Sequence, residues 1–166
     1  DPTEYTPSGV RLFEHQRRTV TFLRLVTPQR EGAILAAEPG LGKTICALQA
    51  LHLDGLLNEP GIIVGPKLCR DVWCHENADP AKHYGMRVIP LAGVKNMDLD
   101  LVTNPANKHF FCHYEILQAW QAWIMMYIKP AWLISDESHL LLHGKVQRSK
   151  SARHLSACGS LRRRYC

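Results

Sequence analysis

The stretch from Ala33 to Thr44 reads AILAAEPGLGKT and decides the fold class. An apolar run of strand length comes first, a glycine-containing turn follows, and Gly-Lys-Thr then opens a helix-forming stretch, ICALQALHLDGLL. Glycines allow a tight loop whose backbone N–H groups converge at a helix N-terminus, an arrangement that binds phosphate. We therefore expect a phosphate-binding loop between a strand and a helix.

This loop predicts ATP and Mg²⁺ as ligands. Lys43 would supply a positive charge to the β and γ phosphates, and Thr44 would offer its hydroxyl to Mg²⁺. The strict Walker pattern has Gly where this chain has Ala37, but the helicase-type variant begins with Ala or Gly and has Gly three residues later. The expected nucleotide-binding loop therefore comprises Ala37, Gly40, Leu41, Gly42, Lys43 and Thr44.

A second motif, AWLISDESH from Ala131 to His139, places two carboxylates after an apolar strand. Metal-holding carboxylates of phosphate-binding domains lie at the carboxyl edge of the sheet. We expect Asp136 to coordinate Mg²⁺ and Glu137 to orient or deprotonate the attacking water. His139 is a candidate for coupling the ATP site to a bound partner, with a surface histidine as the alternative.

The alternation of short apolar runs and longer amphipathic stretches predicts an α/β fold, with a mainly parallel sheet and helices on both faces. Residues 92–108 show the least pattern and predict a surface loop with a short turn of helix. The expected strands are Ala33–Ala37, Gly61–Gly65, Met86–Leu91, His109–His113 and Ala131–Ser135, with a further strand beginning at Arg162. The expected helices are Leu12–Val26, Lys43–Leu57, Lys67–Asn77, Tyr114–Ile128 and Val146–Ala157.

Composition places the chain among soluble intracellular domains of the cytoplasm, nucleoid or nucleus. It has 166 residues, the size of one domain, with 46% apolar content and no apolar run long enough to cross a membrane. Its six cysteines form no CxxC pair, which predicts free thiols. A zinc site built from Cys69, Cys74, His75, Cys112 and His113 is a minor alternative.

The net charge of +5 is unevenly distributed. The chain beyond Gly144 carries basic residues and no acidic one. This segment is either a phosphate-binding surface or a solvated face that a partner domain covers. Its basic residues are Lys145, Arg148, Lys150, Arg153, Arg162, Arg163 and Arg164.

The motifs together resemble superfamily 2 helicases, and more closely the Swi/Snf-type DNA-dependent ATPases. Their first RecA-like lobe has a phosphate loop of the form D-E-x-G-x-G-K-T, where this chain has AEPGLGKT. LFEHQRRTVTFL (Leu12–Leu23) resembles the family's Q-motif helix, GIIVGPKLCRDVWCHE (Gly61–Glu76) its motif Ia, and HFFCHYEIL (His109–Leu117) its motif Ib. The resemblance covers most of the chain and implies a RecA-like P-loop NTPase domain.

The resemblance also implies site residues and a partner. Gln16 occupies the position whose amide reads adenine. Lys67 and the turn at His113 and Tyr114 match segments that face the nucleic-acid backbone, with duplex DNA as the favoured partner. Ordinary packing at strand ends is the alternative for these positions, because phosphate contacts carry little sequence signal.

Three departures from the family pattern are Ala37 in place of Asp, Ser138 in place of Ala, and Cys112-His113 in place of Thr-Thr. The chain stops at RRRYC, where the family continues into motif III. We therefore expect residues 1–166 to be one ATP-binding lobe, truncated before motif III, whose second RecA-like lobe would act in cis or in trans. Such a lobe should bind nucleotide and hydrolyse it slowly, whereas the full-length protein would couple Mg-ATP hydrolysis to movement on DNA.

Two other functions remain open at the level of sequence. A different P-loop NTPase, such as a AAA+ module or a nucleotide kinase, fits the phosphate loop but not Gln16 and the DESH motif. A truncated or degenerate module that senses nucleotide or binds DNA without turnover is the non-enzymatic alternative. Its binding to DNA would fall steeply with salt.

Overall fold

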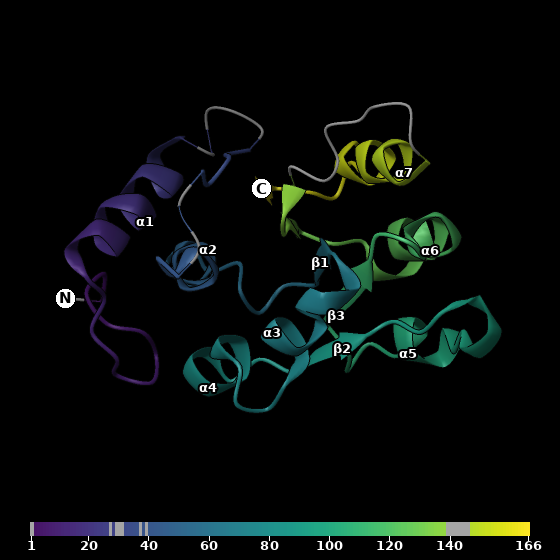
Figure 1. Cartoon of the computed structure of the whole chain (residues 1–166), viewed down its shortest axis with the longest axis horizontal. Coiled ribbons are helices and arrows are strands. Elements are labelled where there is room, and N and C mark those ends of the chain that lie inside the picture. The colour runs from purple at the N-terminus through teal and green to yellow at the C-terminus, as the bar shows by residue number, and fades with distance from the viewer. Residues whose placement is uncertain (1, 27, 29–31, 37, 39, 139–146) are drawn as a thin grey trace.

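The sheet has five parallel strands in the order β2-β3-β1-β4-β5 in the computed structural model (Figure 1). The structure describes residues 2–26, 28, 32–36, 38, 40–138 and 147–166. This architecture agrees with the α/β fold expected from the sequence. The strands are β1 (Gly61–Gly65), β2 (Val88–Pro90), β3 (His109–His113), β4 (Trp132–Ser135) and β5 (Arg163–Tyr165).

The segment before the phosphate loop extends this sheet beyond β5. The Ala33 N–H donates to the Arg164 carbonyl at 3.0 Å, and the Cys166 N–H donates to the Ala33 carbonyl at 3.0 Å. The Leu35 N–H donates to the Cys166 carbonyl at 2.6 Å. The strand expected over 33–37 is therefore only a short parallel pairing, and Ala37 lies outside the described residues.

Side chains alternate between the two faces of the sheet along each strand, and both faces are buried because helices cover them. Ile63 contributes to one core, whereas Ile62 and Val64 contribute to the other. Figure 1 shows the two helical layers that complete these cores. The first core is covered by α1 (Glu14–Val26), α2 (Lys43–Leu53), α3 (Arg70–Cys74) and α4 (Asp79–Tyr84). The second is covered by α5 (Leu99–Thr103), α6 (Leu117–Trp123), η3 (Ile124–Ile128) and α7 (Gln147–Ser156).

Several helices differ from their expected bounds for local reasons. α2 ends at Leu53, before the expected Leu57, because Gly55 adopts a left-handed conformation with φ of 70°. The expected helix over 67–77 divides into a 3₁₀ turn, η1 (Lys67–Cys69), and the short α3. α4 was not expected, and residues 92–108 contain η2 (Val94–Asn96) together with α5.

The C-terminal arginines make internal contacts. Arg163 lies 3.2 Å from the Asp54 carboxylate, which also accepts a 2.8 Å bond from Arg24. Arg162 pairs with Glu59 at 3.7 Å. The Asp54 contacts join β5, α1 and the end of α2, so these arginines do not form the uniform phosphate-binding surface that their sequence clustering allowed.

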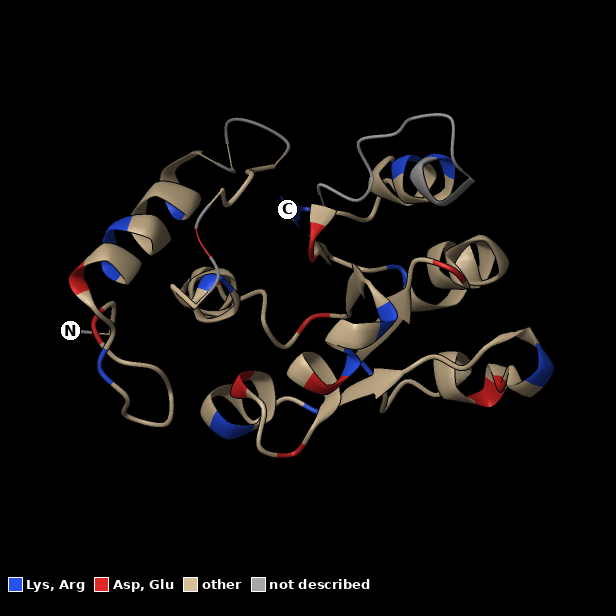
Figure 2. Ribbon diagram, viewed as in Figure 1, with Lys and Arg blue, Asp and Glu red and all other residues tan. Residues whose placement is uncertain are grey.

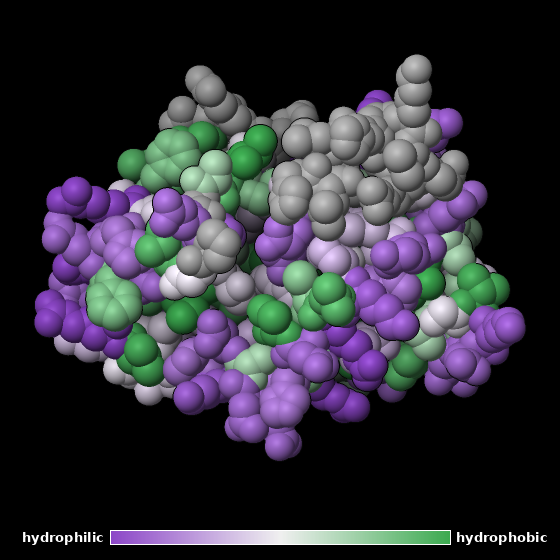
Figure 3. All heavy atoms as spheres, in the orientation of Figure 1, coloured by the Kyte–Doolittle hydropathy of each residue, from purple (hydrophilic) through white to green (hydrophobic). Residues whose placement is uncertain are grey.

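The surface is mixed in character. Figure 2 shows basic and acidic residues distributed over most elements, and Figure 3 shows hydrophobic groups on one face separated by hydrophilic ones. Among the residues that the structure describes, none of the helices combines the length and apolar character needed to span a bilayer.

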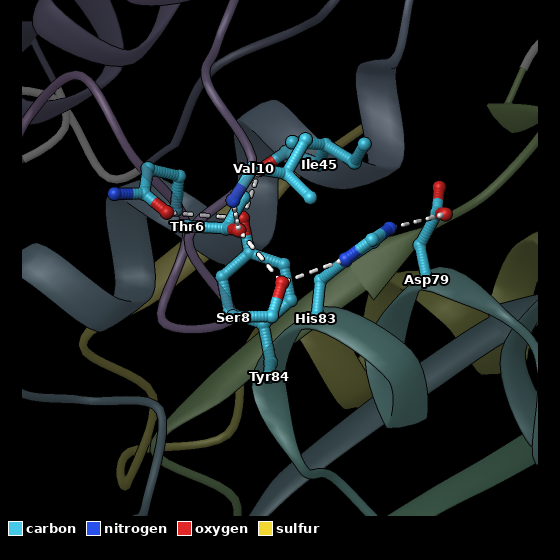
Figure 4. A network of polar contacts seen from close by, with 8 residues as sticks. Thr6, Ser8, Val10, Ile45, Asp79, His83 and Tyr84 are labelled. Atoms are coloured by element: carbon cyan, nitrogen blue, oxygen red, sulfur yellow. Dashed lines mark hydrogen bonds and ion pairs between the residues drawn. The ribbon is translucent and has the colours of Figure 1, made fainter.

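A polar network fastens the N-terminal segment to α4 (Figure 4). Ser8 Oγ lies 3.0 Å from Thr6 Oγ1 and 2.9 Å from His83 Nδ1. The other imidazole nitrogen is 3.7 Å from Asp79, which is too long for the hydrogen bond that orients a catalytic histidine. We therefore assign this Ser-His-Asp group an anchoring role.

Candidate functional site

The loop before α2 depends on two glycines in left-handed conformations. Gly40 has φ of 86° and Gly42 has φ of 78°, values that glycine adopts without steric cost. Gly42 is the N-cap residue of α2, and it supplies no side chain to the first helical N–H groups. These groups lie at the positive end of the helix dipole, which is suited to an anion.

α1 packs directly on this loop through Gln16. Its Nε2 donates to the Leu41 carbonyl at 3.4 Å, and its Oε1 accepts from the Phe13 N–H at 3.0 Å. A Cβ atom at Gly42 would lie 2.3 Å from Nε2. The amide therefore holds the loop in this structure, and it keeps one N–H donor and one oxygen lone pair beyond these two bonds.

Asp136 leaves β4 at the carboxyl edge of the sheet, where described residues contact both its main chain and its carboxylate. Its N–H donates to the Val64 carbonyl at 2.7 Å, and its Oδ1 accepts from the Glu137 N–H at 3.0 Å. The Trp73 indole Nε1 donates to Oδ2 at 2.8 Å, and Tyr114 Oη donates to the main-chain carbonyl at 2.6 Å. Sequence patterns identified Asp136 but gave no indication of these two side-chain donors.

One cavity of about 240 Å³ brings the two motifs together. Lys43 and Thr44 line it from the start of α2, and Asp136 and Glu137 line it from the end of β4. Four residues expected to act together therefore share one site. The remaining wall is formed by Ile34, Leu35, Ala36, Ala47, Trp73, Ile134, Ser135, Ser138, Tyr165 and Cys166.

The donor set suits Mg²⁺. A hydroxyl and a carboxylate face one cavity, and Mg²⁺ in nucleotide sites is held by one or two such protein ligands together with phosphates and waters. Among the described residues, no group of three or more His, Cys, Asp or Glu side chains could hold a metal by itself. The zinc site considered at Cys69, Cys74 and the neighbouring histidines therefore has no support.

Cys69 lies beside the acidic pair. Burial raises the pKa of its thiol to about 11, and the negative charges of Asp136 and Glu137 contribute in the same direction. The thiol is consequently neutral at physiological pH and adds no charge to the site.

The three residues expected to contact nucleic acid lie in different environments. Lys67 is exposed at the start of η1, and His113 ends β3 with its Nδ1 2.6 Å from a Glu115 carboxylate oxygen. The Tyr114 side chain is 2% exposed and is bonded to Asp136, so it lies inside the domain. His139, the expected coupling residue, lies outside the described residues, as does Ala37.

A parallel sheet with helices on both faces and a site at its carboxyl edge defines a RecA-like α/β domain. The family model of the SNF2-related domain matches residues 15–162, and the chain belongs to this family. The resemblance inferred from the sequence motifs is thus confirmed.

Two proteins illustrate the similarity. The DNA repair and recombination protein RAD26 of Saccharomyces cerevisiae is 41% identical over 68 residues, covering 39% of this chain and 6% of RAD26. The solved structure described as the Sulfolobus solfataricus SWI2/SNF2 ATPase core in complex with dsDNA matches with a TM-score of 0.74 at 16% identity. That match covers 98% of this chain and 32% of the solved chain, so the domain spans a small part of each protein.

Proposed function

We propose that this domain binds Mg-ATP as the first lobe of a nucleic-acid-dependent ATPase. The observation that carries the proposal is the cavity shared by Lys43, Thr44, Asp136 and Glu137. A phosphate loop without a carboxylate, or a carboxylate pair away from the loop, would not suit phosphoryl transfer. Membership of the SNF2-related family favours this activity over that of a nucleotide kinase or a AAA+ module.

Each residue has a separate chemical task in this proposal. The Lys43 ammonium binds the β and γ phosphates, and the loop N–H groups around Gly40 and Gly42 bind phosphate oxygens. Thr44 and Asp136 hold Mg²⁺, which when bound neutralises charge on the phosphates. Glu137 orients or deprotonates the attacking water.

Hydrolysis by residues 1–166 should be slow. Among the described residues that line the cavity, Lys43 is the sole cation and no arginine is present. An arginine supplied from elsewhere accelerates related ATPases by about 10³ to 10⁵. We propose that a second RecA-like lobe, in cis or in trans, supplies this charge.

Duplex DNA is the proposed partner. RAD26 is described as a DNA repair and recombination protein, and the solved structure contains dsDNA. Exposed Lys67 and partly buried His113 are the proposed backbone contacts on this chain, and His139 is the proposed link to the ATP site. In the full-length protein, ATP hydrolysis would then drive movement on DNA.

Nucleotide affinity tests the proposal. We expect Lys43→Ala to lower the affinity for Mg-ATP at least tenfold, because one charge-assisted phosphate contact is lost, about 1.4 kcal/mol or more. Lys82→Ala is the matched control, because it also removes one positive charge, from an exposed position on α4. Calorimetric titration of the folded proteins measures both affinities.

Two outcomes would reject the proposal. Equal affinity of the Lys43→Ala and Lys82→Ala variants would mean that nucleotide binds elsewhere. A folded wild-type chain that binds no nucleotide at millimolar ATP, but binds duplex DNA with a steep salt dependence, would favour a DNA-binding module without turnover.

A further inference from the structure

We propose that Trp73 and Tyr114 are positioning residues that hold Asp136 in the orientation required to bind Mg²⁺, an inference that rests on the proposed function. Trp73 comes from α3, which follows β1, and Tyr114 directly follows β3. Two neighbouring strands therefore each direct one hydrogen-bond donor to the same aspartate.

The two donors differ in what they fix. The Trp73 indole bonds the carboxylate oxygen Oδ2 at 2.8 Å and restricts rotation of the carboxylate. The Tyr114 hydroxyl bonds the Asp136 carbonyl at 2.6 Å and restricts the backbone where β4 ends. Both side chains are 2% exposed, so water competes little for either bond.

The carboxylate keeps acceptor capacity for a metal. A carboxylate offers about four lone-pair positions, two on each oxygen. Trp73 occupies one position on Oδ2, and the Glu137 N–H occupies one on Oδ1. The Cys69 side chain also forms a hydrogen bond with Asp136. These three contacts leave about one of the four positions for Mg²⁺ or its water.

The segment before Trp73 also carries exposed residues, and the segment before Tyr114 ends in a partly buried histidine. Exposed Lys67 and Leu68 precede Trp73 by about one to two helical turns, and His113 adjoins Tyr114; Leu68 is 93% exposed. Gly65 lies between the two segments: its carbonyl accepts from the Tyr114 N–H at 2.9 Å, and a Cβ there would lie 3.2 Å from Asp136 Cβ.

The test compares ATP affinity with Mg²⁺ and with EDTA for the wild-type chain and for Trp73→Phe, Tyr114→Phe and Trp120→Phe. Trp120 is the matched control, because its buried indole also donates one 2.8 Å bond, to the Ala92 carbonyl in the second core. Loss of a side chain that orients a metal ligand costs about 10- to 100-fold in metal affinity. The quantity compared is the ratio of ATP affinity with Mg²⁺ to ATP affinity with EDTA, which we call the gain due to Mg²⁺. We expect this gain to fall at least tenfold in Trp73→Phe and Tyr114→Phe.

The control and the EDTA measurements separate positioning from general destabilisation. Affinity in EDTA should stay within about twofold of wild type in Tyr114→Phe and Trp120→Phe, because neither residue lines the cavity and because Lys43 and the loop are unchanged. Trp120→Phe should keep the wild-type gain due to Mg²⁺. Tyr114→Phe removes one hydroxyl and keeps the ring, so it carries the test if Trp73→Phe does not fold.

The outcomes distinguish the inference from the function on which it rests. If the gain due to Mg²⁺ in both Trp73→Phe and Tyr114→Phe equals that of the wild type, the positioning role is overturned, whereas the proposal of Mg-ATP binding still stands. Equal losses in Trp73→Phe and Trp120→Phe would also overturn it, because the effect would then be one of stability. No nucleotide binding by the folded wild-type chain would reject the proposed function, and this inference with it.

Discussion

Gly42 meets two independent constraints that no other residue type satisfies. Its φ of 78° lies in the left-handed region, and the space beside it is filled by the Gln16 amide. The first constraint shapes the phosphate loop, and the second allows α1 to pack against that loop. A single glycine therefore links nucleotide binding to the attachment of the N-terminal helix.

We predict that Gly42→Ala weakens both properties. The new methyl group would lie 2.3 Å from Gln16 Nε2 unless the amide moves, and the left-handed backbone adds strain of about 1–3 kcal/mol. Urea denaturation should show lower stability, and ATP affinity should fall. Gly93→Ala is the control, because Gly93 has φ of −62° and no atom within 4 Å of a new Cβ. Equal behaviour of the two variants would contradict this account.

The sequence singled out four residues that the structure brings into one cavity, but not the rest of the wall or the side chains that support Asp136. Lys43, Thr44, Asp136 and Glu137 belong to contiguous motifs at element ends, and parallel strands bring such ends to one edge of a sheet. The bond from Trp73 to Asp136 depends on the position of α3 relative to β4, which a pattern along the chain does not contain. Tyr114 matched a segment expected to face nucleic acid, yet its side chain is buried.

At the level of elements, the Trp132 ring of β4 lies against Gly61 of β1 because Gly61 lacks a side chain. Gly61 is paired with Trp132, and a Cβ at Gly61 would lie 2.0 Å from the indole ring. The ring occupies this space in the first core, where it is fully buried. Trp132 also donates to the Leu56 carbonyl at 3.1 Å, so the ring has little freedom to move.

We predict that Gly61→Ala destabilises the domain by about 1–3 kcal/mol, the range for overpacked cores. The measurement is the free energy of unfolding from urea denaturation. Gly159→Ala should have a small effect, because its Cβ would meet no atom within 4 Å. A Gly61→Ala variant as stable as Gly159→Ala would show that Trp132 can move aside.

Elements with strong local signals were predicted best. The buried strands β1, β3 and β4 lie within their expected ranges. Short apolar runs bounded by Gly, Pro or Asn are too short for most helices and usually form buried strands. α4 was missed because its six residues are too few to show helical periodicity. The length of the strand expected over 33–37 was overestimated. Its residues form only a short pairing with residues 164–166, and three of them line the cavity.

At the scale of the whole molecule, one buried and one half-buried thiol should limit stability at high pH. Burial raises the pKa of Cys46 from 9.0 to about 11 and that of Cys74 to about 12. These thiols ionise in the unfolded chain at lower pH than in the folded one. Their contribution to stability is therefore complete below about pH 9 and is lost as the pH rises through the folded values.

We predict that the urea midpoint falls between about pH 9 and pH 11. Cys46→Ala should reduce this pH dependence, because the variant lacks one of the thiols whose pKa is raised by folding. Its stability at about pH 8 should already be lower than that of the wild type, because a buried side chain is truncated. Urea titrations at about pH 8, 9.5 and 10.5 provide the measurement. A midpoint independent of pH over this range would contradict the prediction.

The pairing of residues 33–35 with residues 164–166 has a consequence for biosynthesis. A growing polypeptide emerges from the ribosome N-terminus first, at about 5–20 residues per second. The nascent segment ahead of Gly40 must therefore wait on the order of ten seconds for the strand that anchors it. β1, β3 and β4 can associate earlier, so nucleotide capture should be the last property that the newly made domain acquires.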